Sequence, residues 1–230
     1  MKKLLWDSVF FNKKVYEINL DIESFIFKDS EPDVLYVKST ENIDLDIPFY
    51  TKTFEENKIE FCKKLTIVND KKNEVVSIFS ISDYLKYKQD LYKLAYISGE
   101  NSRFLLDEGF GRKSFEKLYQ KWIDNSLNKS IANEFFVYVE NGQILGFITV
   151  SINNDSAKIG LFAVCSNTQG KGIGTQLLMK VENYLIENHV QNLKIPTQLN
   201  NTKACNFYTK SGYKIESNIY IKHYWRNDTI

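Results

Sequence analysis

The chain has 230 residues, and its 30 Lys and Arg against 29 Asp and Glu leave a formal net charge of +1 at pH 7. This balance provides no basic field for nucleic acid and no polybasic segment for anionic lipid, so we expect neither as a partner. The longest apolar stretch, residues 144–152, is far shorter than the roughly 20 residues that cross a bilayer, which argues against membrane insertion.

The cysteine and histidine content indicates the cellular compartment and limits the kinds of metal site that the protein can form. The three cysteines are odd in number and show no CxxC spacing, which favours reduced thiols over a disulfide scaffold or a zinc site. Lys2 and Lys3 are followed by Asp7 without an apolar core region, which is not the pattern of a signal peptide. With only two histidines, a His-centred metal site has few ligands to draw on. We therefore expect a cytoplasmic protein that binds no metal.

The first hundred residues have the pattern of mixed α/β structure with short strands. β-branched and aromatic runs predict strands at residues 34–37 and 75–79. Residues 61–68 fit a strand or the end of a helix, and the period does not decide between them. No internal repeat and no Gly/Ser-rich linker interrupts this part of the chain.

Residues 99–113 are rich in glycine and charge and lack a period, which indicates a long connection. Two of the three arginines, Arg103 and Arg112, lie in this connection, and the guanidinium fork suits phosphate or carboxylate. We place a boundary here, between a smaller N-terminal α/β region over residues 1–110 and a second domain over residues 111–230.

In the second domain the hydrophobic period changes between helix and strand. Ser114 can cap a helix whose apolar residues recur at i, i+3 and i+4, and Asn141-Gly142 predicts a β-hairpin. Gly212 is placed to end the last helix. The expected elements are a helix from 114 to about 126, strands at 135–140, 143–152 and 157–164, a helix at 175–188, a strand starting at 193–195, a helix at 202–211 and one or two strands over 213–225.

A glycine-rich turn, residues 169–174, lies between a predicted strand and an amphipathic helix. Glycines there allow several backbone N–H groups to turn the same way, at a helix end where they have no intrahelical partner. With the helix dipole behind them, these groups form an anion site that fits a pyrophosphate, although a purely structural turn is the alternative. The turn has neither the P-loop spacing nor the GxGxxG of a dinucleotide fold.

The pattern Gln-x-x-Gly-x-Gly, formed by Gln169, Gly172 and Gly174, resembles the acetyl-CoA pyrophosphate loop of the GCN5-related N-acetyltransferase superfamily. Residues 201–213, NTKACNFYTKSGY, resemble its second motif, Asn-x-x-Ala-x-x-Phe-Tyr-x-x-x-Gly-Phe, with Tyr213 replacing the final Phe. The resemblance implies an α/β acetyltransferase fold, with a central, mostly antiparallel, splayed sheet flanked by helices. It also implies an enzyme that uses acetyl-CoA as co-substrate and acetylates an amine.

The resemblance assigns roles to named residues. Tyr208 occupies the position from which superfamily members protonate the sulfur of CoA. The ordinary pKa of a phenol, about 10, is close to the pKa of the thiol that forms. The alternative is that Tyr208 is only a packing aromatic. The residues expected to bind the cofactor through the pyrophosphate turn, the thioester-polarising strand and the second motif are Leu161, Phe162, Ala163, Val164, Gln169, Gly170, Lys171, Gly172, Ile173, Gly174, Thr175, Asn201 and Phe207. Asn201 could also cap the helix that follows it.

A narrower resemblance, to dTDP-fucosamine acetyltransferases, spans nearly the whole chain. It is carried by the motifs WDSxFF from Trp6, SRF from Ser102, LYxxWIxxSL from Leu118 and TQxNN from Thr197. It implies transfer of acetyl to the 4-amino group of a dTDP-linked deoxysugar, in polysaccharide biosynthesis, and a homodimer. The residues that we expect to bind this nucleotide-linked aminosugar are Ser102, Arg103, Phe104, Arg112, Trp122 and Gln198.

Three questions stay open at the level of sequence. No general base can be named, because His189 and His223 have no evident catalytic partner. The same fold could act on another small-molecule or protein amine. A non-catalytic acyl-CoA sensor is the remaining alternative, and the presence of Tyr208 with a full phosphate turn speaks against it.

Overall fold

The computed structural model describes residues 1–22, 32–66, 76–78 and 84–227. Its strands form one ten-stranded sheet in the order β1-β2-β3-β10-β4-β9-β8-β7-β6-β5. The strands are β1 (Lys2–Lys3), β2 (Val15–Asn19), β3 (Val34–Ser39), β4 (Tyr50–Lys64), β5 (Val76–Ile78), β6 (Glu134–Glu140), β7 (Gln143–Asn153), β8 (Ser156–Val164), β9 (Asn192–Gln198) and β10 (Lys214–Arg226). The helices are α1 (Leu5–Phe11), α2 (Tyr84–Ser98), α3 (Arg103–Leu106), α4 (Gly111–Leu127), the 3₁₀ turn η2 (Ser166–Thr168), α5 (Ile173–Glu187) and α6 (Thr202–Lys210).

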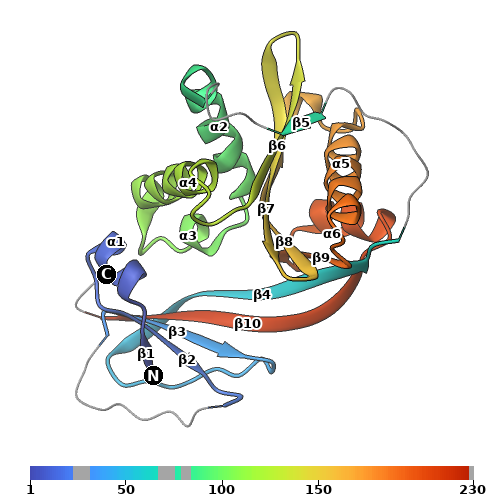
Figure 1. Ribbon diagram of the computed structural model, residues 1–230. Coiled ribbons are helices and arrows are strands. Elements are labelled where there is room, and N and C mark those ends of the chain that lie inside the picture. The colour runs from blue at the N-terminus through green and yellow to red at the C-terminus, as the bar shows by residue number, and fades with distance from the viewer. Residues whose placement is uncertain (23–31, 67–75, 79–83, 228–230) are drawn as a thin grey trace.

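Helices cover both faces of the sheet (Figure 1). α2, α3 and α4 lie on one face, and α5 and α6 lie on the other. Neighbouring strands are antiparallel except for the pairs β2–β3 and β8–β9. The expected α/β fold, a mostly antiparallel sheet flanked by helices, is therefore confirmed.

β4 joins the two parts of the chain. This strand comes from the first third of the sequence, yet it pairs with β10 along one edge and with β9 along the other, both antiparallel. Residues 61–64 of the ambiguous segment belong to it, while residues 67 and 68 lie outside the described residues. β4 therefore brings N-terminal side chains next to the end of β9, where the candidate site lies.

The predicted β-hairpin is confirmed. Asn141 and Gly142 have φ of 50° and 73°, the left-handed pair that a tight two-residue hairpin needs. β6 and β7 run antiparallel on either side of this turn. The expected strands at 34–37 and 157–164 are found as β3 and β8, and the strand expected at 75–79 is found as β5, with its two end residues outside the described part of the chain.

The region 99–113 is more structured than expected. Its middle forms α3, because the Ser102 side chain caps the helix by accepting a hydrogen bond from the backbone N–H of Phe104. α4 then begins at Gly111 rather than after Ser114, so the expected cap at Ser114 is wrong. Five of the six residues predicted for its apolar stripe are buried, namely Phe115, Leu118, Tyr119, Ile123 and Ser126. The sixth, Trp122, is only half-buried, and Leu127 is buried in addition.

The last four elements follow the expected order. α5 begins two residues earlier than predicted, at Ile173, and α6 ends before Gly212, whose φ is 86°. Residues 214–226 form one strand, β10, rather than two. Within the described ranges, no helix is long and apolar enough to cross a membrane.

Candidate functional site: a cavity where two parallel strands separate

The candidate site opens where β8 and β9 part. Their parallel pairing covers only residues 156–158 against residues 192–194, although β8 continues to Val164 and β9 to Gln198. The separation leaves a cavity of about 1080 Å³, slightly above the roughly 300–1,000 Å³ of ordinary ligand pockets. Its volume suits an extended co-substrate together with an acceptor.

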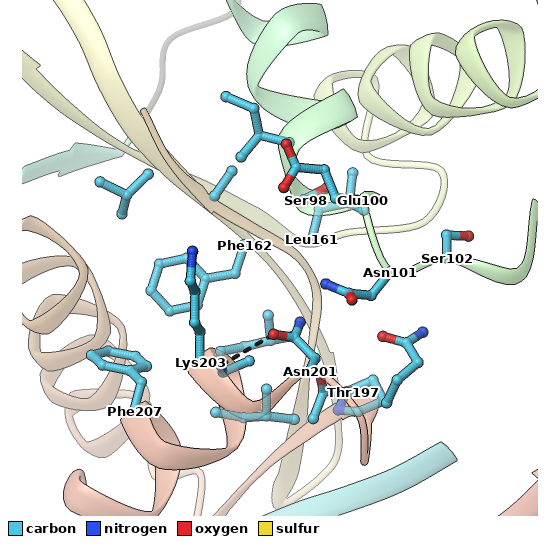
Figure 2. A pocket seen from close by; sticks show the side chains of 18 of the residues that line it. Ser98, Glu100, Asn101, Ser102, Leu161, Phe162, Thr197, Asn201, Lys203 and Phe207 are labelled. Atoms are coloured by element: carbon cyan, nitrogen blue, oxygen red, sulfur yellow. Dashed lines mark hydrogen bonds between the residues drawn. The ribbon is translucent and has the colours of Figure 1, made fainter. Parts of the chain in front are cut away.

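Three groups of elements form its walls (Figure 2). The end of α2 and the residues between α2 and α3 lie on one side, α6 lies on the opposite side, and β8 runs between them. The labelled side chains are Ser98, Glu100, Asn101 and Ser102 on the first wall, Leu161 and Phe162 on β8, Thr197 on β9, and Asn201, Lys203 and Phe207 around α6.

The structure brings nearly all of the sequence-predicted site residues to this one cavity. Those that line it are Ser102, Arg103, Phe104, Trp122, Leu161, Phe162, Ala163, Val164, Gln169, Gly170, Gly172, Ile173, Gly174, Thr175, Gln198, Asn201, Phe207 and Tyr208. Two predicted residues are not among its lining. Lys171 is exposed on the turn, and Arg112 lies on the exposed side of α4, where its Nε donates to Glu116 Oε1 at 2.9 Å. The geometry therefore does not support Arg112 as a contact to a ligand in the cavity.

The start of α5 has the backbone geometry that is typical of an anion site. Gly170 and Gly172 have φ of 79° and 83°, which other residues rarely adopt, and the Gln176 N–H makes the first helical bond, to the Gly172 carbonyl. The N–H groups of Ile173, Gly174 and Thr175 consequently precede the helical ladder. All three residues line the cavity, so the positive end of the helix dipole faces it.

Gly174→Asp tests the acetyl-CoA site that the motif resemblance implies. We expect it to raise the KM for acetyl-CoA at least tenfold, because it places a carboxylate where the helix end would otherwise attract phosphate. A Cβ at this position meets Phe162, Val164 and Phe207 at an ordinary 3.6 Å. Gly174→Ala is therefore a matched control for the added carbon alone. In steady-state kinetics, the KM for acetyl-CoA should rise in Gly174→Asp and stay close to the native value in Gly174→Ala. An unchanged KM in folded Gly174→Asp would place the phosphates elsewhere.

The β8 backbone offers only some of the four predicted amides to the cavity. The Leu161 N–H donates to Thr149 Oγ1 at 2.8 Å and the Cys165 N–H donates to the Leu145 carbonyl at 2.8 Å, both toward β7. Because successive N–H groups of a strand alternate between its two edges, those of Phe162 and Val164 point to the edge that β9 has left. These two are the geometrically suitable donors to a carbonyl oxygen, whereas Leu161 and Ala163 direct their N–H groups toward β7.

Two carboxamides sit at the α6 side of the cavity. The Asn201 side chain accepts a hydrogen bond from the Ala204 N–H at 3.2 Å and so caps α6, while the residue also lines the cavity. The cap and the ligand contact weighed for Asn201 are therefore compatible. Gln198 ends β9, opposite Lys58 of β4, and lines the cavity near Glu56, where it partly opposes the rise that burial causes in the pKa of the carboxyl.

Tyr208 is buried on α6 and also lines the cavity. Its ring packs with Phe61, Phe162, Phe207 and Tyr213, at centroid distances of 5.5 to 6.4 Å. Burial raises the pKa of the phenol well above its ordinary value. The match to a thiolate, which the ordinary value suggests, is thus weaker than expected, but the group stays protonated and able to donate.

Glu56 is the functional candidate that sequence reasoning missed. This β4 residue lies just beyond the last β4–β9 pair, Lys58 opposite Gln198, and it lines the cavity with a side chain only 7% exposed. Its Oε2 has no hydrogen-bond partner among the described residues. Burial raises the pKa of the carboxyl, and the nearby charges of Arg103 and Lys58 partly oppose that rise. A buried carboxylate with a free oxygen is suited to accept a proton.

The charges around the cavity are balanced. Three cations, Lys58, Arg103 and Lys203, and three acids, Asp7, Glu56 and Glu100, line it. Lys203 reaches up from α6 beside Phe162 (Figure 2). The only sequence signal for Lys203 is its place inside the second motif, and nothing in the N-terminal sequence marks Lys58 or Glu56. In the described part of the chain, no group of three or more His, Cys, Asp and Glu residues is arranged to hold a metal ion.

Curated relatives of this chain include a polysaccharide biosynthesis protein and two acetyltransferases. It is 29% identical over 134 residues to the spore coat polysaccharide biosynthesis protein SpsD of Bacillus subtilis, covering 58% of this chain and 46% of the relative. It is 28% identical to dTDP-fucosamine acetyltransferase of Escherichia coli O6:H1, covering 45% of each, and 32% identical to streptothricin acetyltransferase A of Bacillus subtilis, covering 47% and 64%. The chain thus spans about half the length of the first two.

Solved structures and a family model agree on the fold. An acetyltransferase from Novosphingobium aromaticivorans, described as a GNAT family protein, superposes with a TM-score of 0.57 at 11% identity, covering 84% of this chain and 74% of that one. The model of the acetyltransferase (GNAT) family matches residues 90–213, which hold the β8 strand, the glycine turn and α6. This chain belongs to the acetyltransferase (GNAT) family.

Proposed function

We propose that this protein is an acetyl-CoA-dependent N-acetyltransferase that acts by direct transfer. One observation carries the proposal: the anion site at the start of α5, the open edge of β8 and the Tyr208 phenol all face one cavity. The first suits a pyrophosphate and the second a developing oxyanion. The third suits a leaving thiolate.

The groups around the cavity account for each proton in the transfer. The amine nitrogen attacks the thioester carbonyl carbon, and Glu56 takes the proton that the nitrogen loses. The N–H groups of Phe162 and Val164 stabilise the oxyanion. As the carbon–sulfur bond breaks, Tyr208 donates its proton to sulfur.

We further propose that the acceptor is the 4-amino group of a dTDP-linked aminosugar. The names of two relatives, SpsD and dTDP-fucosamine acetyltransferase, support a sugar-related amine. The guanidinium of Arg103 is suited to bind phosphate. Phe104 and Trp122 provide an apolar wall beside it, with their ring centroids 6.0 Å apart in an edge-to-face arrangement. A cytoplasmic location suits the use of acetyl-CoA, and the homodimer remains a prediction from resemblance.

A different amine is the second candidate, because streptothricin acetyltransferase A is also a relative. A site for a polycationic acceptor should be dominated by acids. Here Lys58, Arg103 and Lys203 offset the three acids, which favours an acceptor that carries negative charge as well as an amine. A sensor without chemistry has no use for the buried, unpaired Glu56 oxygen beside the cavity.

Thermal unfolding with single ligands tests this proposal. A ligand at 100 times its Kd should add about 2.7 kcal/mol to the stability of the folded chain. CoA and dTDP should each raise the Tm, whereas spermidine and streptothricin should not. Stabilisation by CoA and streptothricin, without any effect of dTDP, would replace the aminosugar with an antibiotic acceptor; no effect of CoA would refute the acetyltransferase itself.

Arg103→Ala is expected to raise the KM for the dTDP-linked aminosugar roughly 10- to 150-fold, since one charge-assisted contact to phosphate contributes about 1.5–3 kcal/mol. The KM for acetyl-CoA should change little. Arg112→Ala removes an arginine that does not line the cavity and is the matched control. Equal KM values in both variants would show that Arg103 has no part in binding the acceptor.

A further inference from the structure

Three hydrogen-bonded side chains, those of Asp107, His223 and Arg103, connect the protein interior to the cavity wall. Asp107 Oδ2 lies 2.6 Å from His223 Nδ1, and Arg103 Nη1 donates to His223 Nε2 at 3.4 Å. Asp107 and His223 are both fully buried, while Arg103 is partly exposed and lines the cavity. Nothing in the proposed transfer uses Asp107 or His223 directly.

Asp107 is fixed by donors from three elements. Trp225 Nε1 donates to its Oδ2 at 2.9 Å, and Thr53 Oγ1 and the Gly109 N–H donate to its Oδ1 at 3.1 and 3.2 Å. These three donors already occupy both oxygens of the carboxyl group. Although burial acts to raise the pKa of Asp107, the hydrogen bond with His223 holds that pKa below its ordinary value. Asp107 is thus an ionised carboxylate and can only accept from His223. The proton on the ring is therefore on Nδ1, which leaves the Nε2 lone pair to accept from Arg103.

Burial keeps the imidazole of His223 neutral. It lowers the pKa of His223 to about 4, and the positive charge of Arg103 acts in the same direction. At neutral pH the order is therefore carboxylate, neutral imidazole, guanidinium. A neutral ring is the form that can accept a hydrogen bond from an arginine.

Two aromatic rings fix the plane of the guanidinium. Arg103 Cζ lies 4.4 Å from the centroid of Tyr36 and 4.7 Å from that of Phe104. Tyr36 in turn lies beside His223, with ring centroids 4.5 Å apart. One Nη1–H group of Arg103 donates a hydrogen bond to His223, and the other N–H groups of the guanidinium stay available to a ligand. Its ring and imidazole partners hold the guanidinium at the cavity, although the arginine side chain itself is flexible.

We propose that Asp107 and His223 are positioning residues that orient the Arg103 guanidinium toward an anionic group of the acceptor. The inference rests on the proposed function for the identity of that acceptor, but the orientation of Arg103 can be measured without any ligand. The general advantage is preorganisation: a guanidinium already held in place loses less freedom when the anion binds.

NMR of the ligand-free protein measures how rigidly the Arg103 side chain is held. The chain has three arginines, so the side-chain Nε–Hε spectrum contains few signals. The heteronuclear NOE should report Arg103 as rigid and Arg112, whose side chain is 69% exposed, as mobile. In His223→Leu, which removes the acceptor at Nε2 but leaves the rings of Tyr36 and Phe104 in place, Arg103 should become clearly more mobile than in the native protein. In His223→Gln, whose carboxamide oxygen can replace Nε2, much of its rigidity should return.

A control variant must show that a general loss of stability does not by itself make the Arg103 side chain mobile. Tyr213→Phe removes a different buried bond, from the Tyr213 hydroxyl to Glu182 Oε1 at 2.7 Å, and is the matched control. It should leave Arg103 rigid. An Arg103 side chain that is mobile in the native protein, or equally rigid in His223→Leu, would overturn the proposal.

Titration with dTDP then connects the orientation to binding. In His223→Leu the Kd for dTDP should rise roughly 10- to 100-fold, while the Kd for CoA stays the same and His223→Gln recovers part of the loss. Loss of Arg103 order with an unchanged Kd for dTDP would overturn the role in acceptor binding. If the native protein does not bind dTDP, the proposed acceptor fails, and the NMR result still decides whether the chain orients Arg103.

Discussion

Tyr208→Phe is expected to lower kcat by about 10²–10⁴-fold, the range by which a positioned general acid contributes to a reaction. The substitution removes one oxygen from a ring held by aromatic neighbours on several sides, so the packing around α6 should survive. Neither KM should change much, because the proton is needed only when the sulfur leaves. Steady-state kinetics at saturating concentrations of both substrates measures this effect.

The control for Tyr208 is another buried tyrosine outside the cavity. Tyr213→Phe also removes a buried hydroxyl, one that donates to Glu182, and should affect stability more than kcat. If Tyr208→Phe keeps its full kcat, Tyr208 is a packing residue, and the thiolate receives its proton from water or from another group.

Glu56→Gln is expected to lower kcat by a similar factor, about 10²–10⁴-fold, because the amide has nearly the same shape but accepts no proton. Glu60→Gln makes the same change four residues along β4, at a residue that is not part of the cavity lining, and should leave kcat unaltered. A full kcat in Glu56→Gln would show that water or the bulk buffer deprotonates the amine.

The pH dependence gives Glu56 a second test. The carboxyl must be ionised to act as a base, so kcat should fall as the pH falls through its pKa, which burial raises. The positive charge of Arg103 lowers that pKa. Arg103→Ala should therefore move the acid limb of the profile to higher pH, and a limb that stays in place would contradict this assignment.

The sequence predicts the second half of the fold well because its signals are local. The Asn141-Gly142 turn, the apolar stripe of α4 and the stop at Gly212 each depend on residues close together in the chain. The cofactor side of the candidate cavity is likewise contained in two short motifs, around Gly172 and Asn201, and the structure brings both to the same cavity.

The acceptor side depends on contacts that no local pattern encodes. β4 lies between β9 and β10 through long-range pairing, and only this placement brings Glu56 next to Gln198. Asp107 and His223 are 116 residues apart, so His223 gives no sequence sign of its partner. Arg112 illustrates the reverse case: it is close to Arg103 in sequence, but it lies exposed on α4, pairs with Glu116 and is not part of the cavity lining.

Mass spectrometry of the acceptor after incubation with the purified protein and acetyl-CoA tests the central claim most directly. The protein should convert dTDP-4-amino-4,6-dideoxy-D-galactose to a product heavier by one acetyl group, with release of one CoA for each product. That product should be absent when dTDP-fucose, which lacks the amine, replaces it. Hydrolysis of acetyl-CoA without an acetylated sugar, or acetylation of a polycationic amine in its place, would contradict the account.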